Sequence, residues 1–244
     1  MVNINEKDFY TTAELAELLG VSRIAVFKRI KSGSIKATKV GRNFVIFKKD
    51  VGEFEALLSE LFTSAKAWAL SGRQFSEKWY CQTSAVFQAR LVKMENFLLK
   101  GKYKNKLFSL LTSIAGEIGN NSFDHNLGQW PDMPGIFFGY DLLKRHVVLA
   151  DRGVGVLQTL QRVKPALRTH ADALKVAFTE IISGRDPEAR GNGLKYVRSV
   201  IAKYPIRLLF QTGDATLVLR GESEELPITK RTEYIRGCLA FITY

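Results

Sequence analysis

The sequence predicts an α+β protein in which a small winged helix-turn-helix domain is followed by a helical connector and an α/β domain. Three observations predict this order. Two short helical patterns and a hairpin pattern fill the first part, an apolar helical stripe follows, and glycine-bearing turns then separate helices from strands. We therefore place the three parts at residues 1–55, 56–104 and 105–244.

Composition sets the class of protein. Hydrophobic residues make up 46% of the 244 residues and charged residues 25%, the balance of a soluble globular protein rather than a disordered or fibrous one. The chain has no long apolar run, and "MVNINEKDFY" does not read as a signal segment. We expect a cytoplasmic protein without membrane contact. Cys81 and Cys238 are expected as free thiols, and His146 and His170 as structural histidines.

Basic residues gather in one short part of the chain. The net charge is +12, which indicates a polyanionic partner. Between residues 21 and 49 no acidic residue occurs, whereas the basic residues there are Arg23, Lys28, Arg29, Lys31, Lys36, Lys39, Arg42, Lys48 and Lys49. This clustering is the footprint expected of a surface that contacts nucleic acid.

Two helices and a hairpin are predicted in this basic part. Thr11 and Glu14 form a capping-box pattern for a first helix, which ends at Gly20. Ser22 can cap a second helix, in which apolar residues share one face and basic residues point elsewhere. The alternation of "SIKATKV" and "NFVIFKK" around "GRN" predicts a β-hairpin with Arg42 near its tip.

This module resembles the excisionase-type and MerR-type winged helix-turn-helix family over "TTAELAELLGVSRIAVFKRIKSGSIKATKVGRNFVI". The resemblance implies binding to double-stranded DNA. A basic helix can enter the major groove, while a basic hairpin can reach the phosphates or the neighbouring minor groove. The alternative is a helical adaptor with a solvated basic face. The DNA-binding candidates are Ser22, Arg23, Lys28, Arg29, Lys31 and Arg42.

The connector begins with "DVGEFEALLSELFTSAKAWALSG", an apolar-striped helix that ends near Gly72. Such a helix either joins the two domains or pairs two chains. Residues 61–110 carry a basic surplus, which either extends the DNA footprint or forms a solvated face.

A stripe of polar residues follows on the next predicted helix, from Phe108 to Asn126. Glu117, Asn121 and Asp124 stand at intervals of four and three, so they share one side while apolar residues pack on the other. An amide oxygen beside a carboxylate suits Mg²⁺ with retained waters, and Glu117 could act as a general base.

Two glycine motifs come after this helix. "HVVLADRGVGV" predicts a strand that ends in Asp151, followed by Gly153 and Gly155 in a tight turn. "EARGNGLKYVRSVI" places Gly191 and Gly193 directly before a helix, where free backbone N–H groups can hold phosphate. Each motif is weak alone, but the order of all three is specific.

This order resembles the GHKL nucleotide-binding family over roughly residues 105–220, and the resemblance implies an α/β two-layer sandwich of the Bergerat type. "EIGNNSFDHN", "DRGVG" and "RGNGL" correspond to its N box and two glycine boxes. The resemblance implies ATP with Mg²⁺ on Asn121, an adenine contact at Asp151, and a lid from about residue 157 to residue 190. It makes Glu117 the catalytic base, and the remaining cofactor-binding candidates are Asp124, His125, Gly153, Gly155, Arg190, Gly191, Gly193, Leu194 and Thr216.

The parts together favour an ATP- and Mg²⁺-binding, DNA-binding regulatory protein, acting in transcription or on mobile or foreign DNA. Nucleotide state would control DNA binding or assembly. Two alternatives stay open: a serine/threonine protein kinase of the anti-sigma-factor type, and a nucleotide-sensing module without catalysis. Whether ATP is hydrolysed, and whether the chain forms a homodimer or binds a partner protein, is also left open. The C-terminal "YIRGCLAFITY" is expected as a closing strand, whose exposed edge could pair with another chain.

Overall fold

The computed structural model divides the chain into two compact units after Glu60. The residues that the structure describes are 9–18, 22–33, 35–47, 59–72, 76–100, 106–180, 193–221 and 223–244. The first unit holds β1 (Phe9–Thr11), α1 (Thr12–Leu18), α2 (Arg23–Lys31), β2 (Thr38–Val40) and β3 (Asn43–Phe47).

Local sequence signals account for most of the first unit. The Thr11 amide donates to Glu14 Oε2 at 2.7 Å and the Glu14 amide donates to Thr11 Oγ1 at 3.3 Å, so the predicted capping box is confirmed. The predicted hairpin is confirmed as β2 paired with β3, with Gly41 at a φ of 61° in its turn. The predicted helix break at Gly20 lies outside the described residues.

The sequence did not predict β1, which pairs with β3 and makes a three-stranded antiparallel sheet in the order β1-β3-β2. A strand of three residues is too short to show an alternating pattern. The small core beneath this sheet consists of Leu15, Ala16, Val26, Ile35 and Ile46.

The second unit is built around a larger antiparallel sheet with the strand order β4-β5-β6-β8-β7. Its described elements are α4 (Glu60–Ser71), the 3₁₀ helix η2 (Glu77–Trp79), β4 (Tyr80–Cys81), α5 (Ser84–Leu99), α6 (Lys106–Asn126), β5 (Ile136–Asp141), β6 (His146–Asp151), α7 (Gly155–Gln161), α8 (His170–Thr179), α9 (Gly193–Ile201), β7 (Arg207–Leu219) and β8 (Ile228–Thr243).

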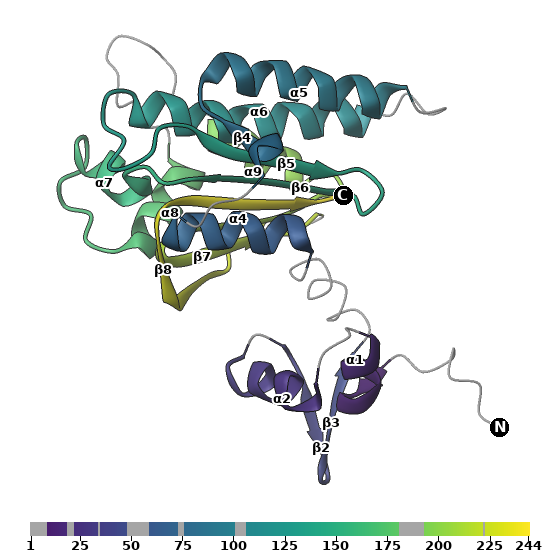
Figure 1. Ribbon diagram of the computed structural model, residues 1–244. Coiled ribbons are helices and arrows are strands. Elements are labelled where there is room, and N and C mark those ends of the chain that lie inside the picture. Colours follow the sequence, from purple (N-terminus) through teal and green to yellow (C-terminus); the bar gives the residue numbers. More distant parts are fainter. Residues whose placement is uncertain are drawn as a thin grey trace. The chain divides into compact units, whose positions relative to one another are not determined.

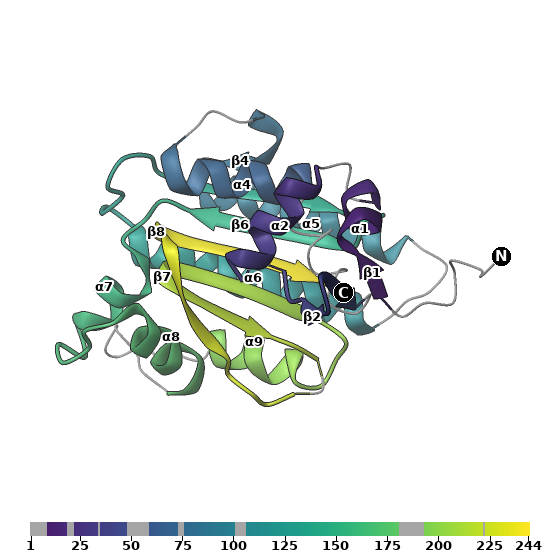
Figure 2. The same ribbon diagram turned by 90° about the horizontal axis from the view of Figure 1, so that it is seen from below.

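Helices cover both faces of this sheet (Figures 1 and 2). On one face, Phe138 packs edge-on against Phe87 of α5, with ring centroids 5.1 Å apart, in a core shared with α6 and α9. On the other face, Phe241 packs against Phe62 of α4 at 5.0 Å. Successive strand residues point to opposite faces, so the sheet is buried on both sides.

The helices expected as a connector pack within the second unit. Helix α4 ends before Gly72, as predicted, whereas the start of the predicted helix lies outside the described residues. Helix α5 begins at Thr83, whose hydroxyl accepts from the Val86 amide, and it packs along α6. The sequence predicted an apolar stripe on the segment of α4 but not which sheet face it would cover.

The C-terminal strand lies inside the sheet. The last eleven residues were expected as a closing strand, and β8 confirms this. Leu239 to Thr243 pair with β6 on one side and with β7 on the other. The idea that this segment offers a free edge to another chain is therefore wrong for residues 239–243, because both edges of that part are already hydrogen-bonded. Among the helices in the described ranges, none combines the length and apolar character needed to span a bilayer.

Candidate functional site

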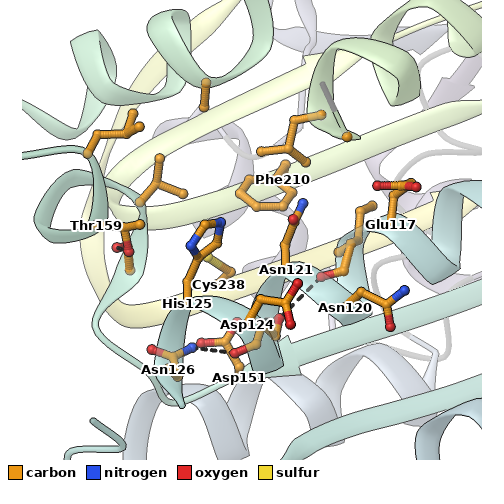
Figure 3. A pocket seen from close by; sticks show the side chains of 18 of the residues that line it. Glu117, Asn120, Asn121, Asp124, His125, Asn126, Asp151, Thr159, Phe210 and Cys238 are labelled. Carbon is orange, nitrogen blue, oxygen red and sulfur yellow. Dashed lines mark hydrogen bonds between the residues drawn. The ribbon is translucent and has the colours of Figure 1, made fainter. Parts of the chain in front are cut away.

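A cavity of about 770 Å³ opens in the second unit beside the polar side of α6 (Figure 3). We call it the α6 cavity. Helix α6 forms one wall, and residues from β6, α7, α8, β7, β8 and the start of α9 complete it. The volume lies within the range of pockets that bind cofactor-sized ligands.

Helix α6 supplies a row of polar side chains to this cavity. Glu117, Asn121, Asp124 and His125 all line it, because spacings of three and four residues place them on one side of the helix. Ile118 also touches the cavity but packs mainly in the core. The amphipathic pattern thus allows one helix to serve both the core and the cavity.

Asp151 is the most deeply buried acid of the cavity wall, at 1% exposure. It ends β6, where its Oδ1 accepts from the Gly153 amide at 2.9 Å and its Oδ2 from the Ser122 hydroxyl at 2.8 Å. Burial raises the pKa of this carboxyl to about 6, although both hydrogen bonds oppose the shift. The carboxyl can accept a hydrogen bond from an amino group of a ligand.

The thiol of Cys238 lies beside Asp151. Burial raises the pKa of Cys238 well above its ordinary value, and the neighbouring Asp151 carboxylate raises it further. A neutral thiol is therefore what the cavity presents at this point. No pattern in the sequence indicated this contact, since strand pairing between β6 and β8 brings the two residues together.

Asn126 links the first glycine motif to the end of α6 through side-chain hydrogen bonds. Its Nδ2 donates to the Ser122 carbonyl at 2.7 Å, and its Oδ1 accepts from the Val154 amide at 2.8 Å. A Cβ at position 153 would lie 2.1 Å from the Asn126 side chain, so only Gly153 permits this approach. The turn after Asp151 is thereby held against the polar helix.

The second glycine motif meets α6 as well. A Cβ on Gly193 would lie 2.5 Å from Glu117 Oε2 and 3.4 Å from Asn121 Nδ2, so the start of α9 sits directly against both side chains. Leu194 lines the cavity beside Gly193. Arg190 and Gly191, the other candidates of this motif, lie outside the described residues.

Thr216 and the expected lid are the remaining predicted parts of the site. Thr216 is buried on β7 near Arg231 and is not among the residues that line the α6 cavity. Thr212 of the same strand instead supports the turn after Asp151, because its Oγ1 accepts from the Val156 amide at 3.3 Å. The expected lid, residues 157–190, is described only to residue 180, where it comprises most of α7, a loop and α8.

Sequence reasoning missed several residues of the site. Ser122 and Asn126 stand inside the quoted polar stretch, and their spacing of four was the signal that could have found them. Phe210 and Cys238 lie far from that stretch in the chain and carry no such signal. All four line the cavity, and Figure 3 labels Asn126, Phe210 and Cys238 among them.

An ion-pair network adjoins the cavity through Arg152, the residue after Asp151. Its Nη1 donates to the carbonyls of Trp68 and Ala69 at the end of α4, at 2.8 and 3.0 Å. Its Nη2 pairs with Asp132 at 2.5 Å, which helps to hold the pKa of that carboxyl below its ordinary value. Arg236 of β8 also approaches Asp132, at 3.3 Å.

Metal ligands are sparse around the cavity. The described ranges contain no group of three or more His, Cys, Asp or Glu residues that could hold a metal ion. Mg²⁺ keeps several waters and often takes its remaining ligands from phosphate oxygens, so an amide oxygen such as that of Asn121 fits it without an all-protein cage.

The first unit presents its candidate DNA-binding residues on and around α2. Arg23, Lys28 and Lys31 are exposed and Arg29 is partly buried. Ser22 precedes the helix, where its carbonyl accepts from the Val26 amide at 3.2 Å. Val26 faces the core, which turns the basic side chains outward. Arg42 is exposed in the turn between β2 and β3, as the hairpin prediction required.

Comparison with known proteins agrees with this geometry in the first unit. Residues 9–55 match the family described as "Helix-turn-helix domain". The chain carries an excisionase-like helix-turn-helix domain there, and a domain of this class suggests DNA binding.

Two curated relatives are similar to part of the chain. The magnetosome protein MamR of Magnetospirillum gryphiswaldense (strain DSM 6361 / JCM 21280 / NBRC 15271 / MSR-1) is 40% identical over 45 residues, which is 18% of this chain and 54% of the relative. MamR of Paramagnetospirillum magneticum (strain ATCC 700264 / AMB-1) is 42% identical over 45 residues, with the same shares of 18% and 54%. The chain spans about half the length of these curated relatives.

Proposed function

We propose that this chain is a DNA-binding regulatory protein whose second unit binds ATP with Mg²⁺ in the α6 cavity, as a domain of the GHKL type. The observation that carries the proposal is the meeting of three separate sequence motifs at one cavity. The polar side of α6, the turn after Asp151 and the start of α9 all contribute to its wall. None of these contacts is required for a packed core alone.

Each wall of the cavity suits a different part of the nucleotide. The buried Asp151 carboxylate would accept a hydrogen bond from the exocyclic amino group of adenine. Asn121 and the start of α9 would hold the phosphates with Mg²⁺, because amide oxygens and free backbone N–H groups are ligands of this charge cluster. Bound Mg²⁺ would neutralise charge on the phosphate oxygens.

Nucleotide binding is tested first by titration calorimetry with ATP and Mg²⁺. We expect the wild type to bind and Asn121→Ala to lose at least about tenfold in affinity, since an amide ligand of the charged site is removed. Asn96→Ala is the matched control, because Asn96 is exposed on α5 and does not line the cavity. An absence of ATP binding in the wild type would overturn the proposal.

The proposed link between nucleotide and DNA runs through α4. Arg152 follows Asp151 directly and holds the carboxyl end of α4, while the amino end of α4 follows the first unit in the chain. A ligand that shifts the Asp151 turn would therefore act on the helix that leads to the DNA-binding domain. Such coupling is reciprocal, so duplex DNA must change the affinity for ATP by the same factor as ATP changes the affinity for DNA.

Glu117 favours a second candidate function, phosphoryl transfer to a protein hydroxyl or to water. Its carboxylate lies against Gly193 and lines the cavity, where a general base would stand near the terminal phosphate. ATP labelled on its terminal phosphate separates the possibilities. Label on a protein indicates a kinase, free labelled phosphate indicates hydrolysis, and neither product, with ATP still bound, leaves a sensing module. Glu117→Gln should abolish either reaction and spare binding.

A further inference from the structure

Among the residues that the structure describes, those lining the α6 cavity carry more negative than positive charge. Its described lining includes the carboxylates of Glu117, Asp124, Asp151 and Glu180. The lysine and arginine side chains of the described lining are Arg162 and Lys195. A polyphosphate would meet repulsion from the acids, so the position of each cation decides how such a ligand can be oriented.

Lys195 belongs to the end of the cavity formed by α6 and α9. It stands in the first turn of α9, two residues after Gly193, whose backbone lies against Glu117 and Asn121. Its side chain is partly buried, and burial lowers the pKa of its ammonium while the nearby Glu180 carboxylate opposes this shift. This is the end of the cavity to which the proposed function assigns the phosphates.

The ammonium of Lys195 has at least one neutral acceptor. It donates to the main-chain carbonyl of Glu180, directly after α8. The carboxylate of Glu180 forms an ion pair with Lys164. A hydrogen bond between an ammonium and a charged oxygen is roughly twice as strong as one between neutral groups, so a phosphate oxygen competes well with a peptide carbonyl.

Arg162 belongs to a different part of the wall. It caps the end of α7 and donates to Gln129 Oε1 in the segment after α6. It carries the same charge as Lys195 and lines the same cavity, but its hydrogen-bond partner lies beyond the carboxyl end of α6 rather than beside α9. This makes it a matched control for the effect of position.

From these contacts we propose that Lys195 is the residue that binds the terminal phosphates of the nucleotide, exchanging the Glu180 carbonyl for a phosphate oxygen. The inference rests on the proposed function and extends it, because it names the group by which the site distinguishes a triphosphate from a nucleoside. A flexible stem with a compact charge suits such an exchange better than a rigid guanidinium.

Calorimetry with ATP and with adenosine, each with Mg²⁺, tests this proposal. We expect Lys195→Met to weaken ATP binding by about tenfold or more and to change adenosine affinity less than about twofold. Lys195→Arg, which keeps the charge, should retain most of the ATP affinity. Arg162→Met should affect ATP by less than about threefold. Tryptophan fluorescence of each variant in urea checks that it is folded.

Each result of this calorimetry either supports or overturns the proposal for Lys195. If Lys195→Met weakens ATP and adenosine equally, or weakens neither, the proposal for Lys195 is wrong while nucleotide binding stands. An Arg162→Met loss equal to that of Lys195→Met would overturn it too, because charge alone and not position would then matter. If the wild type binds neither ligand, the proposed function fails together with this inference.

Discussion

The candidate DNA-binding side chains of the first unit lie in one short stretch of the chain, from Ser22 to Arg42. Most of them are exposed. The candidate nucleotide-binding side chains of the second unit extend from Glu117 to Cys238 and meet around a cavity. A local surface can be recognised from a short motif, because each residue acts largely alone on a phosphate backbone. A cavity requires distant segments to approach closely, so it depends on the packing of the whole unit.

The largest expected effect comes from a methyl group placed in the second unit. A Cβ on Gly237 would lie 2.2 Å from Asp151 Oδ1 and 2.3 Å from its backbone oxygen. Gly237→Ala should lower the free energy of unfolding of the second unit by about 3 kcal/mol, since the backbone must move. Urea unfolding followed by tryptophan fluorescence measures this, because Trp68, Trp79 and Trp130 all belong to that unit.

The first unit provides the matched glycine. Gly41 has a φ of 61°, but a Cβ there would have no atom within 4 Å. Gly41→Ala should therefore cost only about 1 kcal/mol, from backbone strain, and leave the fluorescence transition unchanged. A fluorescence transition shifted as much in Gly41→Ala as in Gly237→Ala would contradict the difference in packing between the units.

The next effect is the pH dependence of Asp151. Its pKa is about 6 in the folded unit and near 3.8 in the unfolded chain. Between these values the folded unit holds a proton that the unfolded chain has released, so its free energy of unfolding falls as the pH rises through this window. The expected fall is on the order of 2–3 kcal/mol.

Urea midpoints between pH 4 and pH 7 measure this slope, and Asp151→Asn should remove it. Taking the difference between wild type and variant cancels carboxyls such as Asp132, whose lowered pKa gives the opposite slope. ATP affinity in the wild type should weaken below about pH 6, as the acceptor becomes protonated. Identical slopes in wild type and variant would refute the assignment to Asp151.

A smaller effect is expected at Arg152, where the two units are proposed to communicate. Arg152→Met removes the hydrogen bonds to the end of α4 and should bring the ratio of DNA affinities with and without ATP close to one. A wild-type ratio of roughly 5–150 corresponds to typical coupling energies of about 1–3 kcal/mol. Fluorescence anisotropy with labelled duplex DNA measures the ratio.

Arg236→Met is the control for this experiment, because Arg236 approaches the same Asp132 but donates no hydrogen bond to α4 among the described contacts. It should keep most of the wild-type ratio. If Arg152→Met kept that ratio as well, the route through α4 would have to be abandoned.

The smallest effect concerns a single exposed charge of the first unit. Lys28→Ala should weaken DNA binding by less than about tenfold and reduce the slope of log affinity against log salt concentration by about one, as for one lost phosphate contact. Lys144→Ala, which removes an exposed lysine of the second unit, should change neither quantity. An unchanged slope in Lys28→Ala would exclude that lysine from the DNA contact.

Much of the fold followed from local patterns. The capping box at Thr11, the hairpin turn at Gly41 and the end of β6 at Asp151 are set by residues within a few positions of one another. The strand β1 escaped prediction because three residues show no periodicity. The packing of α4 on the second face of the sheet was not predicted either, because an apolar stripe does not indicate which surface it packs against.

For the candidate site, the sequence by itself determined which residues could act: the polar stripe of α6, the acid at the end of β6 and the glycines that follow. It also determined the basic surface of α2. Only the tertiary structure decided that Cys238 and Phe210 join the cavity, that Thr212 supports the turn after Asp151 while Thr216 is not among the lining residues, and that Arg152 holds α4. The physical reason is that motif spacing acts over one or two helical turns, whereas strand pairing and close packing bring together residues that are far apart in the chain.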